Sequence, residues 1–244
     1  MRRLLRLLPL GLLASPAVAQ VLPKISVGLE QARTPQEASV AMQVVFLLTI
    51  LSIAPAILLL MTPFTRIVTV MGFLKKALGT QTTPPNQIVV GLSLFLTWFV
   101  MQPQIKEIND MALQPYLSQQ IGWKEGLEKG MKPMRAYMLR QTGENELATM
   151  VRISKTPRPR NADDIPNAVL IPSYVISELK TAFLIGFLIY LPFLVIDMVV
   201  ASILMSLGMM MLPPVMVSLP LKLILFVSVD GWNLVAHGLV QSFR

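Results

Sequence analysis

One apolar run, residues 181–229, reads TAFLIGFLIYLPFLVIDMVVASILMSLGMMMLPPVMVSLPLKLILFVSV and holds only two charged side chains, Asp197 and Lys222. It is long enough for two helices, because about 20 residues cross the hydrocarbon core of a bilayer. A hairpin folded about residues 209–210 would bring Asp197 and Lys222 to the same depth. Since a charge within a membrane protein usually faces a partner, we predict that they pair. Glu178, just before the run, is the competing partner for Lys222, across a contact between subunits.

The bend of this hairpin, within residues 206–216, combines helix breakers with flexible apolar side chains. The breakers are Gly208, Pro213 and Pro214, and the apolar side chains are three successive methionines, Met209, Met210 and Met211. Methionine fills irregular gaps without a fixed shape, and rings of apolar side chains can close a pore by dewetting. Repeated around a symmetric ring, the methionines would form a deformable seal. The alternative is that they face lipid or fill a core at an ordinary turn.

Composition restricts the class of protein. Of 244 residues, 54% are hydrophobic and 14% are charged, which is too apolar for an ordinary soluble domain. Cysteine is absent, which excludes a disulfide framework and a thiolate metal site. The net charge is +8, but three of the arginines lie in a leader, leaving 18 basic against 13 acidic side chains. We interpret the remaining excess as a signal of membrane topology and expect no nucleic-acid partner.

The leader, residues 1–19, has the parts of a secretory signal peptide. A basic start is followed by a short apolar core and by Ala17-Val18-Ala19, a small-x-small cleavage site. An uncleaved anchor is the alternative, but the apolar core is too short to span a bilayer. Cleavage would leave residues 20–40 as a periplasmic segment.

Residues 41–101 predict a first helical hairpin. Residues 41–61 are long enough to span a bilayer, whereas residues 87–101 would reach only about 22 Å. Residues 62–86 between them are expected to form a cytoplasmic loop, because they carry a basic cluster and the N-terminus lies outside. The cluster consists of Arg66, Lys75 and Lys76.

Residues 102–172 are polar and are expected to form a small periplasmic helical region. They carry ten basic and eight acidic side chains, which indicates a solvated surface. Residues 111–120 and 123–140 favour helices, and residues 154–167 favour an exposed, extended loop. Residues 173–244 then form the second hairpin, so the expected fold is all-α with four apolar segments.

Seven prolines lie in or beside these apolar segments. Irregular backbone at membrane depth is tolerated only where protein covers it or where it lines a cavity. One small chain with kinked helices cannot cover itself, so we expect a ring of identical copies. The prolines are Pro55, Pro63, Pro103, Pro192, Pro213, Pro214 and Pro220.

Other classes of function fit less well. An intramembrane aspartyl protease would need two aspartates at one depth, but Asp197 and Asp230 would be offset by about 12 Å. His237, the only histidine, has no metal-binding partners in the sequence. A small-molecule or ion transporter would fit the charges within the membrane, but no inverted repeat is visible. A scaffold of an assembly that lines no pore would share every feature except the methionine bend.

Four long stretches resemble the signature segments of the FliP family of type III secretion, which is related to the SctR proteins of injectisomes. They are PPNQIVVGLSLFLT (84–97), IPSYVISELKTAF (171–183), LPFLVIDMVVASILMSLGMMMLPP (191–214) and LPLKLILFVSVDGWNL (219–234). Pro63 and Lys75 depart from the family's more usual small residue and arginine. The resemblance covers nearly the whole chain after the leader.

This resemblance implies a subunit of the flagellar protein export gate, without enzymatic activity or cofactor. Five copies would form a ring in the inner membrane and on its periplasmic side, within the basal body. The ring would assemble with FliQ and FliR, work with FlhA and FlhB, and pass unfolded flagellar subunits. Met209, Met210 and Met211 match the family's gasket, and Glu178, Asp197 and Lys222 match its charged positions.

Overall fold

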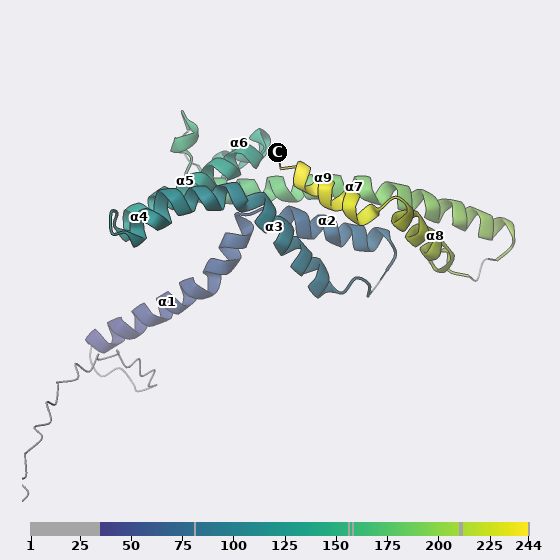
Figure 1. Ribbon diagram of the computed structural model, residues 1–244, viewed down its shortest axis with the longest axis horizontal. Coiled ribbons are helices and arrows are strands. Elements are labelled where there is room, and N and C mark those ends of the chain that lie inside the picture. The colour runs from purple at the N-terminus through teal and green to yellow at the C-terminus, as the bar shows by residue number, and fades with distance from the viewer. Residues whose placement is uncertain (1–34, 81, 156, 158, 210–211, 244) are drawn as a thin grey trace, which may run out of the picture. The chain divides into compact units, whose positions relative to one another are not determined.

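The computed structural model describes residues 35–80, 82–155, 157, 159–209 and 212–243, and the regular structure within them is entirely helical. The chain divides into two units, residues 1–48 and 49–244. The described part of the first unit is the start of helix α1 (Pro35–Leu60). All later helices belong to the second unit (Figure 1).

Helix α1 presents an apolar surface on all sides. Residues 42–60 have the hydropathy and length of a membrane span, and none of them is buried. A helix that is apolar all round is stable when lipid or another protein surrounds it. The first apolar segment is therefore a helix, as the sequence predicts.

Helix α2 (Phe64–Ala77) occupies most of the stretch expected to be a basic loop, so that expectation is wrong for these residues. Its apolar side chains recur at helical spacing and form a buried face. The helix lies along α7 (Asn167–Ser206), as Figure 1 shows. Arg66 belongs to the buried face and is only 2% exposed. Lys75 and Lys76 lie in the last turn, half-buried and exposed respectively. The basic cluster that predicted a cytoplasmic loop therefore belongs to an amphipathic helix.

Helix α3 (Asn86–Ile108) continues past the end of the short apolar segment. It is followed by a π-helical turn, η1 (Asn109–Leu113), and a short helix, α4 (Gln114–Leu117). Together they form a continuous stretch of 32 residues that is long enough to cross a membrane. The helical stretch therefore continues without a break from apolar residues 87–101 into the polar region.

The polar region is helical, as predicted, but contains one helix more than the sequence analysis expected. Helix α5 (Trp123–Gln141) matches the predicted segment, while α6 (Glu144–Ile153) was not predicted; both pack on α7. The described residues from 154 to 166 contain only a short 3₁₀ turn, η2 (Ala162–Asp164), in agreement with the expected loop.

Helices α7 and α8 (Pro214–Ser228) form the hairpin predicted from residues 181–229, and α8 runs back beside α7 (Figure 1). With 40 residues, α7 is about 60 Å long, twice the usual hydrocarbon thickness. Helix α9 (Gly231–Gln241) follows α8 at an angle of 65°. Only glycine fits at position 231, because a Cβ there would lie 2.2 Å from the Phe226 ring.

Two apolar clusters hold residues 49–244 together. One joins α2 to α3, α7, α8 and α9, and the other joins α5 to α3 and α7 around Tyr137 and Tyr174. Within the described residues, three helices could cross a membrane, or four if α8 and α9 form one bent span. This agrees with the four apolar segments expected from the sequence.

Candidate functional site

The connection between α7 and α8 begins with a glycine-dependent helix end. Gly208 adopts φ +73°, in the left-handed region. Its N–H donates to the Met205 carbonyl at 3.1 Å, and the Met209 N–H donates to the Leu204 carbonyl at 3.0 Å. These two bonds form a Schellman motif, which satisfies the last carbonyls of α7 and turns the chain sharply.

Two prolines define the other side of the connection. Pro213 caps α8 in an extended conformation, and Pro214 occupies its first turn, where the missing N–H costs no helical hydrogen bond. The chain therefore leaves α7 and enters α8 abruptly. Met210 and Met211, between these two ends, lie outside the described residues.

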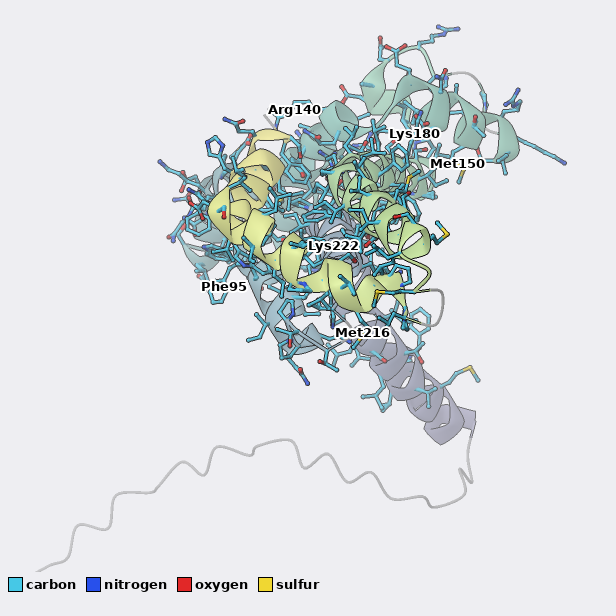
Figure 2. All side chains as sticks on the ribbon, turned by 90° about the vertical axis from the view of Figure 1, so that its right-hand side faces the viewer. Phe95, Arg140, Met150, Lys180, Met216 and Lys222 are labelled. Atoms are coloured by element: carbon cyan, nitrogen blue, oxygen red, sulfur yellow. The ribbon has the colours of Figure 1, made fainter. Side chains whose placement is uncertain are left out.

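The described side chains at this bend are apolar and exposed. Figure 2 views the molecule from the side of the bend and labels Met216 next to it. The exposed set consists of Leu207, Met209, Leu212, Val215 and Met216. An apolar tip of this kind is stable in lipid or against other protein, so the bend is a candidate contact surface.

Behind the bend, Lys222 on α8 pairs with Asp197 on α7, as predicted from their equal distance along the sequence from the bend. Lys222 Nζ lies 2.6 Å from Asp197 Oδ2 and donates a second bond, of 3.1 Å, to the Ala77 carbonyl. Ser218 Oγ donates to Asp197 Oδ1 at 2.5 Å. Because Ala77 ends α2, the ammonium group also faces the negative end of that helix dipole. One buried cation thus ties α2, α7 and α8 together.

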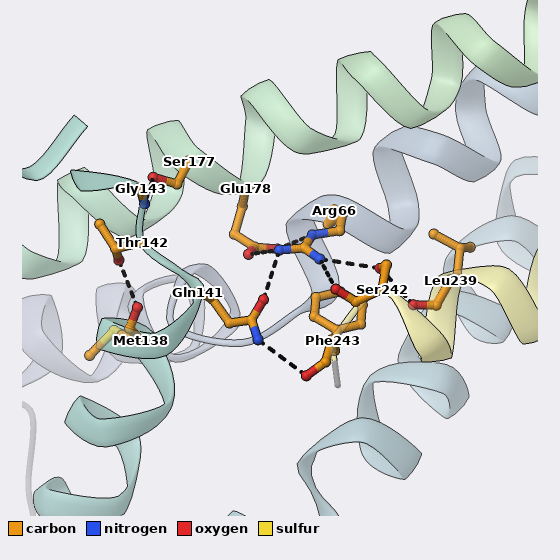
Figure 3. A network of polar contacts seen from close by, with 10 residues as sticks. All are labelled: Arg66, Met138, Gln141, Thr142, Gly143, Ser177, Glu178, Leu239, Ser242 and Phe243. Atoms are coloured by element: carbon orange, nitrogen blue, oxygen red, sulfur yellow. Dashed lines mark hydrogen bonds and ion pairs between the residues drawn. The ribbon is translucent and has the colours of Figure 1, made fainter. Parts of the chain in front are cut away.

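Glu178 pairs with Arg66 within this chain, and not with Lys222 (Figure 3). Arg66 Nη2 lies 2.5 Å from Glu178 Oε1, and Nε lies 2.9 Å from Oε2, so the contact is bidentate. Both side chains are almost completely buried. Two parallel charge-assisted bonds give such a contact strength and a fixed orientation.

The Arg66 guanidinium also holds the end of α5 and the residues after α9. Nη2 donates to Gln141 Oε1 at 3.1 Å, and Nη1 donates to the Ser242 carbonyl at 2.9 Å and to its hydroxyl at 3.2 Å. The Phe243 ring packs over the guanidinium, 4.0 Å from its carbon (Figure 3). Four distant parts of the chain meet at one cation. No sequence pattern indicates these contacts, because the hydrogen-bond partners named here lie 75 to 176 residues from Arg66.

The acidic residues and the histidine considered as catalytic or metal-binding candidates lie apart from one another. The described residues contain no group of three or more metal-binding side chains. Asp230 bonds to the Asn233 amide on its own helix, whereas Asp197 pairs with Lys222. His237 lies on the exposed side of α9 near Gln241. The two aspartates thus have different partners on different helices, unlike the paired carboxylates of an aspartyl protease.

The fold and the buried pairs define a helical membrane protein in which ion pairs join α7 to α8 and to α2. The model of the FliP family matches residues 47–239. The chain is 51% identical to the flagellar biosynthetic protein FliP of Bacillus subtilis over 209 residues, 86% of this chain and 95% of that protein. It is 47% identical to the protein of the same name from Caulobacter vibrioides over 234 residues, 96% of this chain and 86% of that one. The chain belongs to the FliP family.

Proposed function

We propose that this protein is a core subunit of the flagellar type III protein export gate, and that it lines and closes the channel through which unfolded flagellar subunits leave the cell. Membership of the FliP family supports the flagellar assignment. The observation that favours a gate is the α7–α8 bend. Its described side chains are apolar and exposed, and a buried ion pair behind it joins the two helices of the hairpin.

The proposed seal consists of Met209, Met210 and Met211 from several identical copies that converge on one axis. Their flexible thioether side chains would separate around a passing chain and close behind it. Without a chain, the apolar constriction would exclude water and therefore ions. The rigid ends of the bend, Gly208 on one side and Pro213-Pro214 on the other, would keep the three methionines at the axis.

The further assignments rest on the resemblance to the family. We propose a ring of five copies, assembled with FliQ and FliR and working with FlhA and FlhB, in the inner membrane and on its periplasmic side. Residues 1–19 would be a cleaved signal peptide, and residues 102–172 would lie in the periplasm. Lys75 and Lys76 remain exposed enough to act as positive-inside charges, whereas Arg66 is paired and buried. We assign the subunit no enzymatic role and no cofactor.

The test replaces the three methionines by alanine in cells that lack their own copy. If the bend is a seal, the variant should assemble normally but leak ions across the inner membrane. Leakage is measured as the rate of ion-driven swelling of spheroplasts, and assembly as comigration with the basal body. A matched variant replaces Met198, which is exposed on α7 away from the bend, and should not leak. Normal assembly without leakage would favour a scaffold and contradict the seal.

A further inference from the structure

One side of helix α8 is not covered by the described part of the chain. The buried residues of this helix, Ser218, Lys222 and Phe226, recur every four residues and therefore form a single face. Lys222 and Ser218 use this face to contact Asp197 on α7. The opposite side is exposed, and we call it the outer face of α8. The outer face of α8 carries Met216, Pro220, Leu223 and Val227.

Helix α7 also has an exposed side, opposite the one that contacts α8. Asp197 pairs with Lys222, and Val200 and Leu204, three and seven residues further on, are buried. The outer face of α7, about half a turn away, carries Val195, Val199, Ser202 and Ser206, all exposed. Neither outer face has a charged side chain, because the two charges of residues 181–229 pair inside the hairpin.

Pro220 leaves a backbone acceptor on the outer face of α8 without its usual helical donor. In a regular helix, the N–H of residue 220 would bond to the Met216 carbonyl, but proline has no N–H. In lipid such a carbonyl is costly, unless a neighbouring helix or a serine side chain supplies a donor. In water, the exposed apolar side chains around it would be unfavourable instead. A second apolar helix that carries a hydroxyl group would relieve either cost.

The hydroxyl of Ser202, on the outer face of α7, can supply this hydrogen bond. It donates to the Met198 carbonyl of its own helix at 2.9 Å. That carbonyl also has a regular helical donor, the backbone N–H of Ser202 itself. The hydroxyl can therefore rotate to another acceptor and leave no group of α7 unpaired. Serine side chains commonly bond across helices in membranes in this way.

Ser202 and Met216 lie at nearly the same depth in the hairpin. Asp197 and Lys222 are in contact at 2.6 Å, so they define a common level on α7 and α8. Ser202 lies five residues from this level toward the bend, and Met216 lies six residues from it in the same direction. At 1.5 Å per residue, the two distances are about 7.5 and 9 Å. In a ring of hairpins that stand side by side, Ser202 of one copy would face Met216 of the next.

We propose that the outer face of α7 in one copy packs against the outer face of α8 in the next copy, and that the Ser202 hydroxyl donates to the Met216 carbonyl across this contact. The partner of both surfaces is a second copy of this chain. Because two different surfaces meet, the contact is heterologous, and contacts of this kind generate rings when the rotation between copies closes. The inference rests on the proposed ring and names the surfaces that build it.

Cysteine pairs test whether the two outer faces meet. Val195 and Leu223 lie two and one residues beyond the level of the ion pair, so their depths differ by about 1.5 Å. Val195→Cys and Leu223→Cys are placed in separate, differently tagged copies in the same cells, in a chain that has no other cysteine. Oxidation should link the two copies. Leu225→Cys is the matched control, because Leu225 is as exposed as Leu223 but lies on another side of α8, and it should not link to Val195→Cys.

The outcome separates this interface from the gate itself. If cysteines at 209–211 link neighbouring copies but the Val195 and Leu223 variants do not, the ring stands and the proposed interface is overturned. If neither set links, the ring is contradicted as well. Equal linking of Val195→Cys to Leu223→Cys and to Leu225→Cys would also overturn the interface.

The hydrogen bond is tested by Ser202→Ala. Because Ser202 is exposed, the fold of the single chain should not change. Association between copies is measured as the ratio of rings to single chains on native gels of detergent extracts over a dilution series. The association constant should fall about three- to tenfold for each contact, the effect of one hydrogen bond. Ser228→Ala removes an exposed hydroxyl that bonds to its own helix at 2.7 Å, away from the outer face of α8, and should associate normally.

Adding Pro220→Ala to Ser202→Ala should restore association. An alanine at position 220 has an N–H that satisfies the Met216 carbonyl within α8, so the contact no longer needs the hydroxyl. Unchanged association in Ser202→Ala, or no recovery in the double variant, would overturn the hydrogen bond.

Discussion

Replacing Glu178 by glutamine should destabilise the protein strongly, because it leaves the Arg66 guanidinium buried without a counter-charge. Arg66 makes five hydrogen bonds, two of them to Glu178, and both side chains are almost fully buried. Removing one partner of such a pair costs about 3–5 kcal/mol. The assay is the midpoint of unfolding of the purified chain in mixed micelles with increasing denaturing detergent.

The double variant Arg66→Met with Glu178→Leu should recover most of that loss, since no unpaired charge remains. Recovery should be incomplete by about 1–2 kcal/mol, because Gln141 Oε1 and the Ser242 carbonyl lose the donor that Arg66 supplied. A double variant no more stable than Glu178→Gln would refute this reasoning, as would a single variant with unchanged stability.

The Lys180–Glu146 pair, two residues further along α7, is the matched control. Its atoms lie 2.7 Å apart, but Lys180 is 66% exposed, so water screens the interaction. Lys180→Ala should therefore leave the unfolding midpoint unchanged within error. The hydrogen bond from Lys180 lowers the pKa of Glu146, so any contribution of the pair is present at neutral pH and disappears only as the pH falls through that lowered pKa.

Three further experiments test other parts of the structure. Gly208→Ala should cost about 1–2 kcal/mol from backbone strain alone, because φ is +73° and a Cβ would meet nothing within 4 Å; a normal unfolding midpoint would contradict the helix end. Gly186→Ala should cost about 1–3 kcal/mol of stability, because its Cβ would lie 2.5 Å from the Phe73 ring. Adding Phe73→Ala should recover part of the loss, and no recovery would show that the clash lies elsewhere. Asp197→Lys and Lys222→Asp should each lower the amount of protein in the membrane, measured by immunoblot. The double variant, which exchanges the two charges, should restore part of that amount. A double variant as scarce as either single one would argue against the pairing.

The second hairpin could be predicted because the residues that determine it lie within one continuous stretch of sequence. An uninterrupted apolar run, one glycine and two prolines place the bend, and equal spacing from the bend brings Asp197 and Lys222 together. Helix α2 could not be predicted in the same way, because its basic residues resemble a cytoplasmic loop. Its helical pattern of apolar side chains was the available signal.

The Arg66–Glu178 contact depends on tertiary packing and has no sequence signature. Glu178 could be recognised as a charge at the start of an apolar helix, but its partner lies 112 residues away on a helix assigned to a loop. Distances along the chain indicate neighbours within one hairpin, not between helices that pack only after folding.

Cysteine crosslinking at positions 209, 210 and 211 tests the central claim most directly. One cysteine at a time replaces a methionine in a chain that has no other cysteine, and cells are oxidised with and without a stalled export substrate. We predict crosslinks between neighbouring copies at rest, replaced by crosslinks to the stalled chain during export. Cysteines that remain unlinked in both states, while reacting with a lipid-soluble thiol reagent, would show that these side chains face the acyl chains and seal nothing.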